Sequence, residues 1–290
     1  MRLDVYLTKK FDGELTRSQI NNAIKAGNVT VNGVPVKKSG FEVREADTVD
    51  AEIAPEQPTA APEQMPIDII FQDEHLMIIN KPRGLVVHPG NGNKSGTLLN
   101  GLLALGNDGL ERAGIVHRLD KNTAGLVVVA KTAQVQSKLS AMLEEHSVER
   151  TYIGIVEGRL EGSGTIDKNI VRDERNRTLY KTSPTGGRRA VTHYKVIDTF
   201  ARHSLVGFRL ETGRTHQIRV HCKAIGHPIV GDPEYNPTGT VKATGQMLES
   251  IRLAFTHPIT GKPIVQSIDP GEEFKYILDY VTKNDKKRAH

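Results

Sequence analysis

Residues 114–131 read GIVHRLDKNTAGLVVVAK, a polar loop that runs directly into an apolar strand. The loop, residues 117–123, carries charged and hydrogen-bonding side chains, whereas residues 126–130 (LVVVA) are all apolar. A short apolar run of this kind is typical of a strand that is buried on both faces. Loops at the ends of rigid strands often present catalytic groups, so we expect functional side chains here.

Strand-like and helix-like segments alternate on both sides of this stretch. Strands are predicted at residues 67–71, 76–80, 126–130 and 152–156, helices at 97–105 and 133–146, and an antiparallel pair at 190–199 and 203–211. Strands outnumber helices, and the connections vary in length. The pattern predicts an α+β domain on a mixed, largely antiparallel sheet over residues 67–282, with a basic tail at 283–290.

A proline-rich stretch separates this domain from a smaller one. Residues 55–66 contain Pro55, Pro58, Pro62 and Pro66 and almost no large apolar side chain. Such a segment cannot build a core, and its prolines favour an extended, semi-rigid spacer. We therefore expect a linker at 55–66 between a module at 1–54 and the larger domain.

The small module shows a helix followed by a hairpin. Thr16 and Gln19 form a capping-box pattern, and Gly27 is placed to end the helix. Asn32-Gly33 then predicts a tight hairpin turn. Four cations on this helix and hairpin make the module a candidate for binding a phosphate backbone: Arg17, Lys25, Lys37 and Lys38.

The bulk composition is that of a globular protein with a basic surface. Of the 290 residues, 37% are hydrophobic and 25% are charged, and the net charge is +5. Basic residues gather at 1–40, 172–189 and 202–223, which indicates a polyanionic partner; Arg188 and Arg189 are candidate phosphate contacts. A single cysteine excludes an internal disulfide and argues against a thiolate zinc site. Without a long apolar run or a signal-peptide pattern, we expect a cytoplasmic protein.

Asp120 is the carboxylate of the polar loop, and Arg118 and Lys121 are its close neighbours. Nearby cations favour the ionised carboxylate, which suits a nucleophile or a base. An aspartate that only caps a turn has the same local surroundings. The loop alone therefore leaves both roles open.

Three ordered blocks decide between these roles. Residues 114–131, residues 150–158 (RTYIGIVEG) and residues 210–221 (LETGRTHQIRVH) resemble the RluA-type family of pseudouridine synthases. Residues 15–20 and 26–38 are similar to the alpha-L RNA-binding domain, first seen in a small-subunit ribosomal protein. With both domains, the resemblance is closest to the D-type enzymes of that family, which modify large-subunit ribosomal RNA.

The resemblance implies a redox-neutral isomerisation of uridine to pseudouridine. It makes Asp120 the catalytic aspartate, places Tyr152 against the target base, and pairs Arg214 with Asp120. Arg118 would help to open the RNA or hold the space left by the flipped uridine. We expect no cofactor and no metal, a stem-loop of large-subunit ribosomal RNA as the partner, and a monomeric enzyme.

Two departures from the family pattern keep other functions in view. Ala124 stands where a hydroxyl residue is common, and Glu249-Ser250 stands where relatives usually carry His-Ala. The second change leaves open a non-catalytic RNA-binding or ribosome-assembly factor on the same scaffold. A nucleoside hydrolase would need a second carboxylate as acid, and the motif offers none. His216 and His221 lack zinc-protease spacing, so we expect structural or RNA-facing roles for them.

Overall fold

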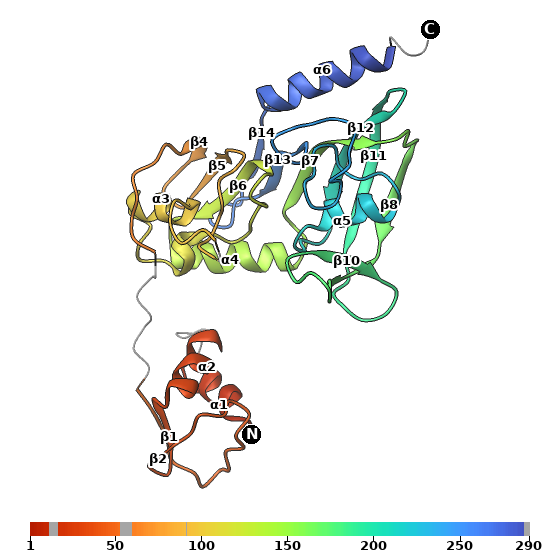
Figure 1. The fold of residues 1–290 in the computed structure, drawn as a ribbon. Coiled ribbons are helices and arrows are strands. Elements are labelled where there is room, and N and C mark those ends of the chain that lie inside the picture. The colour runs from red at the N-terminus through yellow and green to blue at the C-terminus, as the bar shows by residue number, and fades with distance from the viewer. Residues whose placement is uncertain (12–16, 53–59, 91, 287–290) are drawn as a thin grey trace. The chain divides into compact units, whose positions relative to one another are not determined.

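The computed structural model describes residues 1–11, 17–52, 60–90 and 92–286 (Figure 1). The chain divides into two compact units, Met1–Thr59 and Ala60–His290. The two units are described separately below. The first half of the predicted linker, up to residue 59, lies outside the described residues.

The first unit holds two helices and a small sheet. Its elements are α1 (Leu3–Lys10), α2 (Arg17–Ala26), β1 (Val29–Val31), β2 (Val34–Pro35) and β3 (Val49–Ala51), and the strand order is β2-β1-β3. Apolar side chains from both helices and from β1 form its core, among them Leu3, Leu7, Ile20, Ile24 and Val29.

The predicted helix and hairpin of this unit are confirmed, and α1 and β3 are additions. Gly27 follows α2 with φ 87°, and Asn32 and Gly33 turn the hairpin with φ 51° and 75°. Positive φ at both turn positions is what a two-residue hairpin requires. Thr16 lies outside the described residues, as do the side chains of Arg17 and Gln19.

The second unit is built on a nine-stranded sheet in the order β4-β5-β6-β13-β7-β12-β11-β8, with β14 beside β13. Its strands are β4 (Asp68–Gln72), β5 (Leu76–Lys81), β6 (Ala124–Ala130), β7 (Glu149–Glu157), β8 (Ser163–Asp167), β11 (Val191–Thr199), β12 (His203–Leu210), β13 (Leu248–Thr256) and β14 (Pro263–Ser267). All neighbours pair antiparallel except β6 and β13, which are parallel. The predicted α+β class with a mixed, largely antiparallel sheet is confirmed.

Helices cover both faces of this sheet because its central strands are apolar on both sides. They are α3 (Leu98–Ala104), α4 (Ala133–Glu144), α5 (Gln217–Ala224) and α6 (Glu272–Lys286), with a short 3₁₀ turn at Glu111–Gly114 and a separate ladder of β9 (Asn169–Arg172) and β10 (Tyr180–Ser183). Val127 and Val129 pack with α3 and α5, whereas Leu126 and Val128 pack with α4. This alternation is the two-residue period of a strand.

The helix α6 covers the same face as α4, farther along the sheet. Phe274, Ile277 and Val281 belong to one hydrophobic cluster with Ile153 and Ile155 of β7. The predicted basic tail at 283–290 therefore needs correction, because α6 continues to Lys286 and only residues 287–290 lie outside the description. Amphipathic spacing in this segment, with apolar residues three and four apart, allows the helix to bury one side.

The far end of the predicted linker also needs correction. Ala60 is 6% exposed and belongs to the core of the second unit. The Glu63 N–H donates to the Asn100 carbonyl at 3.0 Å, and the Asn100 side chain donates to the Ala61 carbonyl at 2.8 Å. Proline-rich chain without large apolar groups can still be fixed when a buried polar side chain satisfies its backbone. Across the described helices, none has the length and apolarity needed to cross a membrane.

Candidate active site

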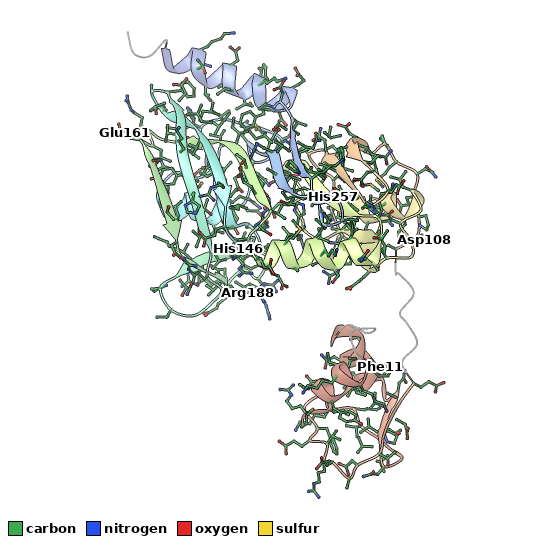
Figure 2. The ribbon with its side chains drawn as sticks, turned by 180° about the vertical axis from the view of Figure 1, so that it is seen from behind. Phe11, Asp108, His146, Glu161, Arg188 and His257 are labelled. Atoms are coloured by element: carbon green, nitrogen blue, oxygen red, sulfur yellow. The ribbon has the colours of Figure 1, made fainter. Side chains whose placement is uncertain are left out.

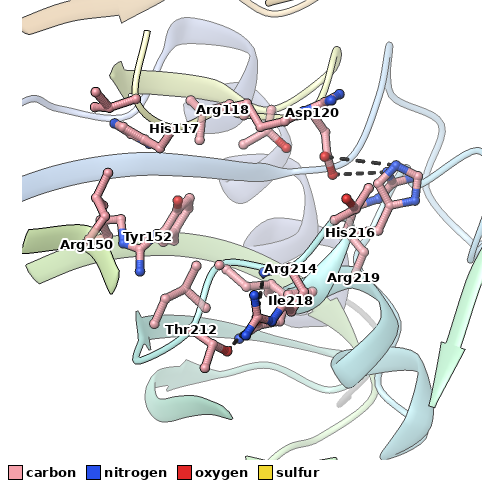
Figure 3. Close-up of a pocket in the computed structure, with 18 of the residues that line it drawn as sticks. His117, Arg118, Asp120, Arg150, Tyr152, Thr212, Arg214, His216, Ile218 and Arg219 are labelled. Carbon is pink, nitrogen blue, oxygen red and sulfur yellow. Dashed lines mark hydrogen bonds and ion pairs between the residues drawn. The ribbon is translucent and has the colours of Figure 1, made fainter. Parts of the chain in front are cut away.

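A pocket of about 760 Å³ opens on the α3 and α5 face of the large sheet. Its walls come from the loop before β6, the start of β7, the segment after β12 and the beginning of α5 (Figure 3). Both Asp120 and Tyr152 line it, although they are 32 positions apart in the chain. The sequence-predicted pair is therefore brought together in one cavity.

Asp120 sits at the edge of this pocket with its carboxylate partly buried at 17% exposure. Its backbone carbonyl accepts the Thr123 N–H at 3.1 Å, which closes the turn before β6. One carboxylate oxygen accepts a hydrogen bond from Arg219 at 3.2 Å, and the other lies 3.9 Å from Nε2 of His216 (Figure 3). The Asp120 side chain thus caps no helix and instead contacts the Arg219 cation in the pocket wall.

The predicted pairing of Arg214 with Asp120 is wrong, because Arg219 makes that contact. His216 adopts a left-handed φ of 56° immediately before α5, so Arg214 lies ahead of the helix and Arg219 lies within it. Arg214 instead donates from Nε to the Arg189 carbonyl at 3.2 Å. Burial, and then the nearby Arg188 cation, lower the pKa of Arg214.

Arg219 is fixed by three carboxylates. It is 3% exposed and forms a two-pronged pair with Asp232 at 2.7 and 2.8 Å, and it donates to Glu234 at 2.6 Å. Burial alone would lower the pKa of Arg219, but Asp232 and Asp120 raise it above its ordinary value. The arginine therefore stays charged and holds Asp120 in one orientation. Asp232 and Glu234 lie 13 and 15 positions downstream of Arg219, so no local sequence signal marked it as the buried cation.

Lys81 holds the loop that carries Asp120 in place through its backbone. This residue, at the end of β5, is 1% exposed, and its Nζ donates to the carbonyls of Pro82, Leu85 and Lys121 at 3.0, 2.9 and 3.2 Å. Burial lowers the pKa of Lys81 to about 7, and the Asp120 carboxylate acts in the opposite direction. The ammonium ties the backbone next to Asp120 to the strand edge.

Arg83 ties the same loop to the C-terminal part of the unit. Its guanidinium donates to the Asn122 and Gln246 carbonyls, to Glu249 at 3.0 Å, and approaches Glu273 at 3.2 Å. Glu249 is 4% exposed, and it also accepts the Gly271 N–H at 2.8 Å. The glutamate at this departure from the family pattern is thus the buried partner of Arg83, whose side chain is 13% exposed.

Tyr152 projects from β7 into the pocket and is 5% exposed. Burial raises the pKa of Tyr152, while the Arg150 cation and a hydrogen bond with Ser250 act in the opposite direction. The phenol therefore stays protonated near neutral pH. Ser250, the second departure from the family pattern, also donates to the Leu126 carbonyl at 3.3 Å.

The two histidines of the third block have different surroundings. His216 lies between Asp120 and Tyr235, whose hydroxyl is 2.8 Å from its Nδ1. Burial lowers the pKa of His216, with Asp120 acting the opposite way. His221 is fully buried against Thr192 at 2.9 Å, as expected of a structural residue.

The predicted RNA contacts fall in separate places. Arg118 is exposed at the pocket rim. Arg188 is exposed in the segment between β10 and β11 (Figure 2), and Arg189 is ion-paired with Asp167 at 2.7 Å. Lys25, Lys37 and Lys38 are exposed on the first unit, whose position relative to the pocket is not defined.

A metal site does not emerge from the part of the chain that the structure describes. No group of three or more histidine, cysteine, aspartate or glutamate side chains is arranged there to hold an ion. The free thiol of Cys222 is fully buried, and burial raises its pKa. The pocket is lined by the Asp120 carboxylate, the Tyr152 phenol and several arginine and histidine side chains.

Comparison with known proteins agrees with both units. Residues 75–224 match the sequence model of RNA pseudouridylate synthase, and residues 1–49 match the S4 domain. An uncharacterized RNA pseudouridine synthase of Bacillus subtilis is 39% identical, covering 98% of this chain and 95% of its own length. A ribosomal large subunit pseudouridine synthase D of Xanthomonas campestris is 38% identical, covering 99% and 91%.

A solved structure supports the fold of the second unit. The human RNA pseudouridylate synthase domain containing 4 protein superposes with a TM-score of 0.60 at 22% identity, covering 74% of this chain and 92% of that one. At this identity the likeness concerns the fold alone. This structure confirms the expected fold, and the sequence matches confirm the expected family.

Proposed function

Since this chain belongs to the RNA pseudouridylate synthase family, we propose that it converts particular uridines of large-subunit ribosomal RNA to pseudouridine, with Asp120 as its catalytic carboxylate. The observation that carries the catalytic role is the pair of Asp120 and the buried Arg219 in a pocket that also holds Tyr152. RNA pseudouridylation is the activity of the family; the residue roles and the ribosomal target are the proposal.

The reaction requires bond exchange without redox change. The glycosidic C1′–N1 bond of uridine breaks, the uracil turns, and a C1′–C5 bond forms; a proton leaves C5 and N1 gains one. Asp120 supplies the carboxylate that starts this exchange, and Arg219 keeps it ionised and oriented. A charge held in advance costs no reorganisation when the reaction begins.

Tyr152 gives the freed base a surface. Its ring lies buried in the same cavity as Asp120, so a detached uracil can stack on it and turn without escaping. Its protonated hydroxyl is a hydrogen-bond donor at that position. The target uridine must leave its stem to reach this cavity, at a cost of a few kcal/mol in lost stacking.

The ribosomal target rests on the relatives and on the charge. Relatives such as the Xanthomonas campestris enzyme carry the ribosomal large subunit in their name, and the S4 match covers the basic first unit. Lys25, Lys37 and Lys38 are exposed there and free to meet phosphates.

Pseudouridine formation on transcribed large-subunit ribosomal RNA tests the proposal, with small-subunit RNA as comparison. Asp120→Asn should lower the single-turnover rate by about 10²- to 10⁴-fold, the usual contribution of such a group. Asp108→Asn, at an exposed carboxylate outside the pocket (Figure 2), should keep the wild-type rate. Equal rates for both variants would remove the catalytic role, and modification of small-subunit RNA alone would remove the target.

A further inference from the structure

Arg150 is a buried cation that has no partner within the described part of the molecule. It is 6% exposed, lines the pocket, and its Nε atom is buried without any hydrogen bond. The contrast with Arg219 is clear, because Arg219 is equally buried but is held by three carboxylates. Of the two buried arginines in this pocket, one has its charge compensated by carboxylates and the other does not.

An unpaired guanidinium in this position works against folding. Removing a charge from water carries a large free-energy cost, which only an opposite charge and well-aligned hydrogen bonds offset. A methionine of similar length would fill the same space without that cost. The presence of an arginine at position 150 is thus explained by an anionic ligand that binds its guanidinium, and not by the packing of the protein alone.

The position of Arg150 points to the substrate. It precedes Tyr152 by two residues on β7, so both side chains lie on the same face of the strand. Figure 3 shows this pair on one side of the pocket and Asp120 with Arg219 on the other. A ligand that reaches from Asp120 past Tyr152 along β7 therefore meets Arg150.

Two neighbours keep the guanidinium available. Gly213 leaves room for it, because a Cβ atom there would lie 2.7 Å from Nη1 of Arg150. His117 offers no charge, since burial and then the Arg150 cation lower its pKa to about 3, and its Nε2 accepts the Val128 N–H at 3.0 Å. Neither residue neutralises the arginine.

We propose that Arg150 binds a backbone phosphate next to the target uridine and so fixes the nucleotide against Tyr152. The reason for a phosphate is that bases and riboses are neutral, and the phosphodiester is the one anion that an RNA chain brings into the pocket. Arginine matches its oxygens with two parallel donors. The inference rests on the proposed function in that it takes this pocket as the site where uridine reacts.

The test begins with RNA from cells that lack the protein. Wild-type enzyme and total RNA identify the modified uridine, whichever RNA carries it, so a wrong ribosomal target does not affect the result. Synthetic stem-loops then carry that uridine with either a normal flanking phosphodiester or a neutral methylphosphonate on its 5′ or 3′ side. Values of kcat/KM are measured under single-turnover conditions for wild type, Arg150→Met, Arg150→Lys and the control Arg159→Met. Arg159 is an exposed arginine just past the other end of β7 and outside the pocket.

With the normal stem-loop, Arg150→Met should lower kcat/KM by about 10- to 150-fold, the range of a charged hydrogen bond. Arg150→Lys should lower kcat/KM by a smaller factor, and Arg159→Met should keep the wild-type kcat/KM. One methylphosphonate should impose the same loss on wild type and no further loss on Arg150→Met. Independent losses at both phosphates, or an unchanged rate in Arg150→Met, would overturn the proposal.

Thermal unfolding provides the second readout. Because the cation is unpaired, Arg150→Met should melt at the wild-type temperature or above it. A lower melting temperature, or failure to fold, would mean that Arg150 is a structural residue and would reject the phosphate site. An active Asp120→Asn enzyme would instead reject the catalytic proposal, and the phosphate dependence of the Arg150 variants would still be read on its own.

Discussion

Replacing Arg219 by methionine is the perturbation that tests the centre of this site most directly. Arg219 is 3% exposed and Asp232, its two-pronged partner, is fully buried. Loss of the guanidinium would leave that carboxylate unpaired, which typically costs about 3–5 kcal/mol of unfolding free energy. The single bond to Asp120 is charge-assisted and about 1.5–3 kcal/mol in strength, so its loss should slow the reaction by roughly 10- to 150-fold.

Arg214→Met is the matched control, because this arginine lies in the same block and lines the same pocket. Its guanidinium donates to one backbone carbonyl, so the change should cost only about 0.5–1.5 kcal/mol. The chain has no tryptophan, and urea unfolding is therefore followed by far-ultraviolet circular dichroism. Single-turnover rates are compared at a temperature where every variant remains folded.

The two measurements separate the two roles of Arg219. Adding Arg219→Met to Asp120→Asn should slow the reaction no further, whereas the loss of stability should persist in the double variant. If Arg214→Met were the destabilised and inactive protein while Arg219→Met kept wild-type stability and rate, the ion-pair assignment drawn from the structure would be refuted.

Three further predictions concern stability and binding. Burial raises the pKa of Glu157, but hydrogen bonds, led by the one from His203, lower this pKa to about 2. The ionised Glu157 therefore stabilises the fold by at most about 3 kcal/mol above pH 4.5, and this stabilisation is lost as the pH falls through 2. The unfolding free energies of wild type and Glu157→Gln should converge between pH 7 and pH 3, and a constant gap would contradict this. Arg83→Met leaves Glu249 unpaired and should cost about 3 kcal/mol in urea unfolding, with the single-turnover rate falling more than RNA affinity. Deleting residues 1–59 should weaken RNA binding and flatten its salt dependence while the second unit keeps its circular dichroism spectrum, and an unchanged salt slope would exclude the first unit from binding.

The sequence by itself determined the elements and the neighbourhood of the site. The valine run at 126–130 and the Asn32-Gly33 turn predict their structures from local periodicity and turn chemistry, and both are found. The resemblance to the family implies that Asp120 and Tyr152 share a site, and they line one pocket. The strand and the turn follow from residues close together in the chain, where backbone propensity and the apolar pattern act.

Tertiary structure alone decided which charges meet. Arg214 and Arg219 stand in the same block, and nothing local distinguishes them as partners for Asp120, which lies 99 positions before Arg219. The left-handed backbone at His216 and the burial of α5 place Arg219 within the helix, facing Asp120, and leave Arg214 ahead of the helix. In the same way, only packing shows that Arg150 is buried without a partner. Pairing and desolvation depend on distances in space, and a chain of residue types does not contain them.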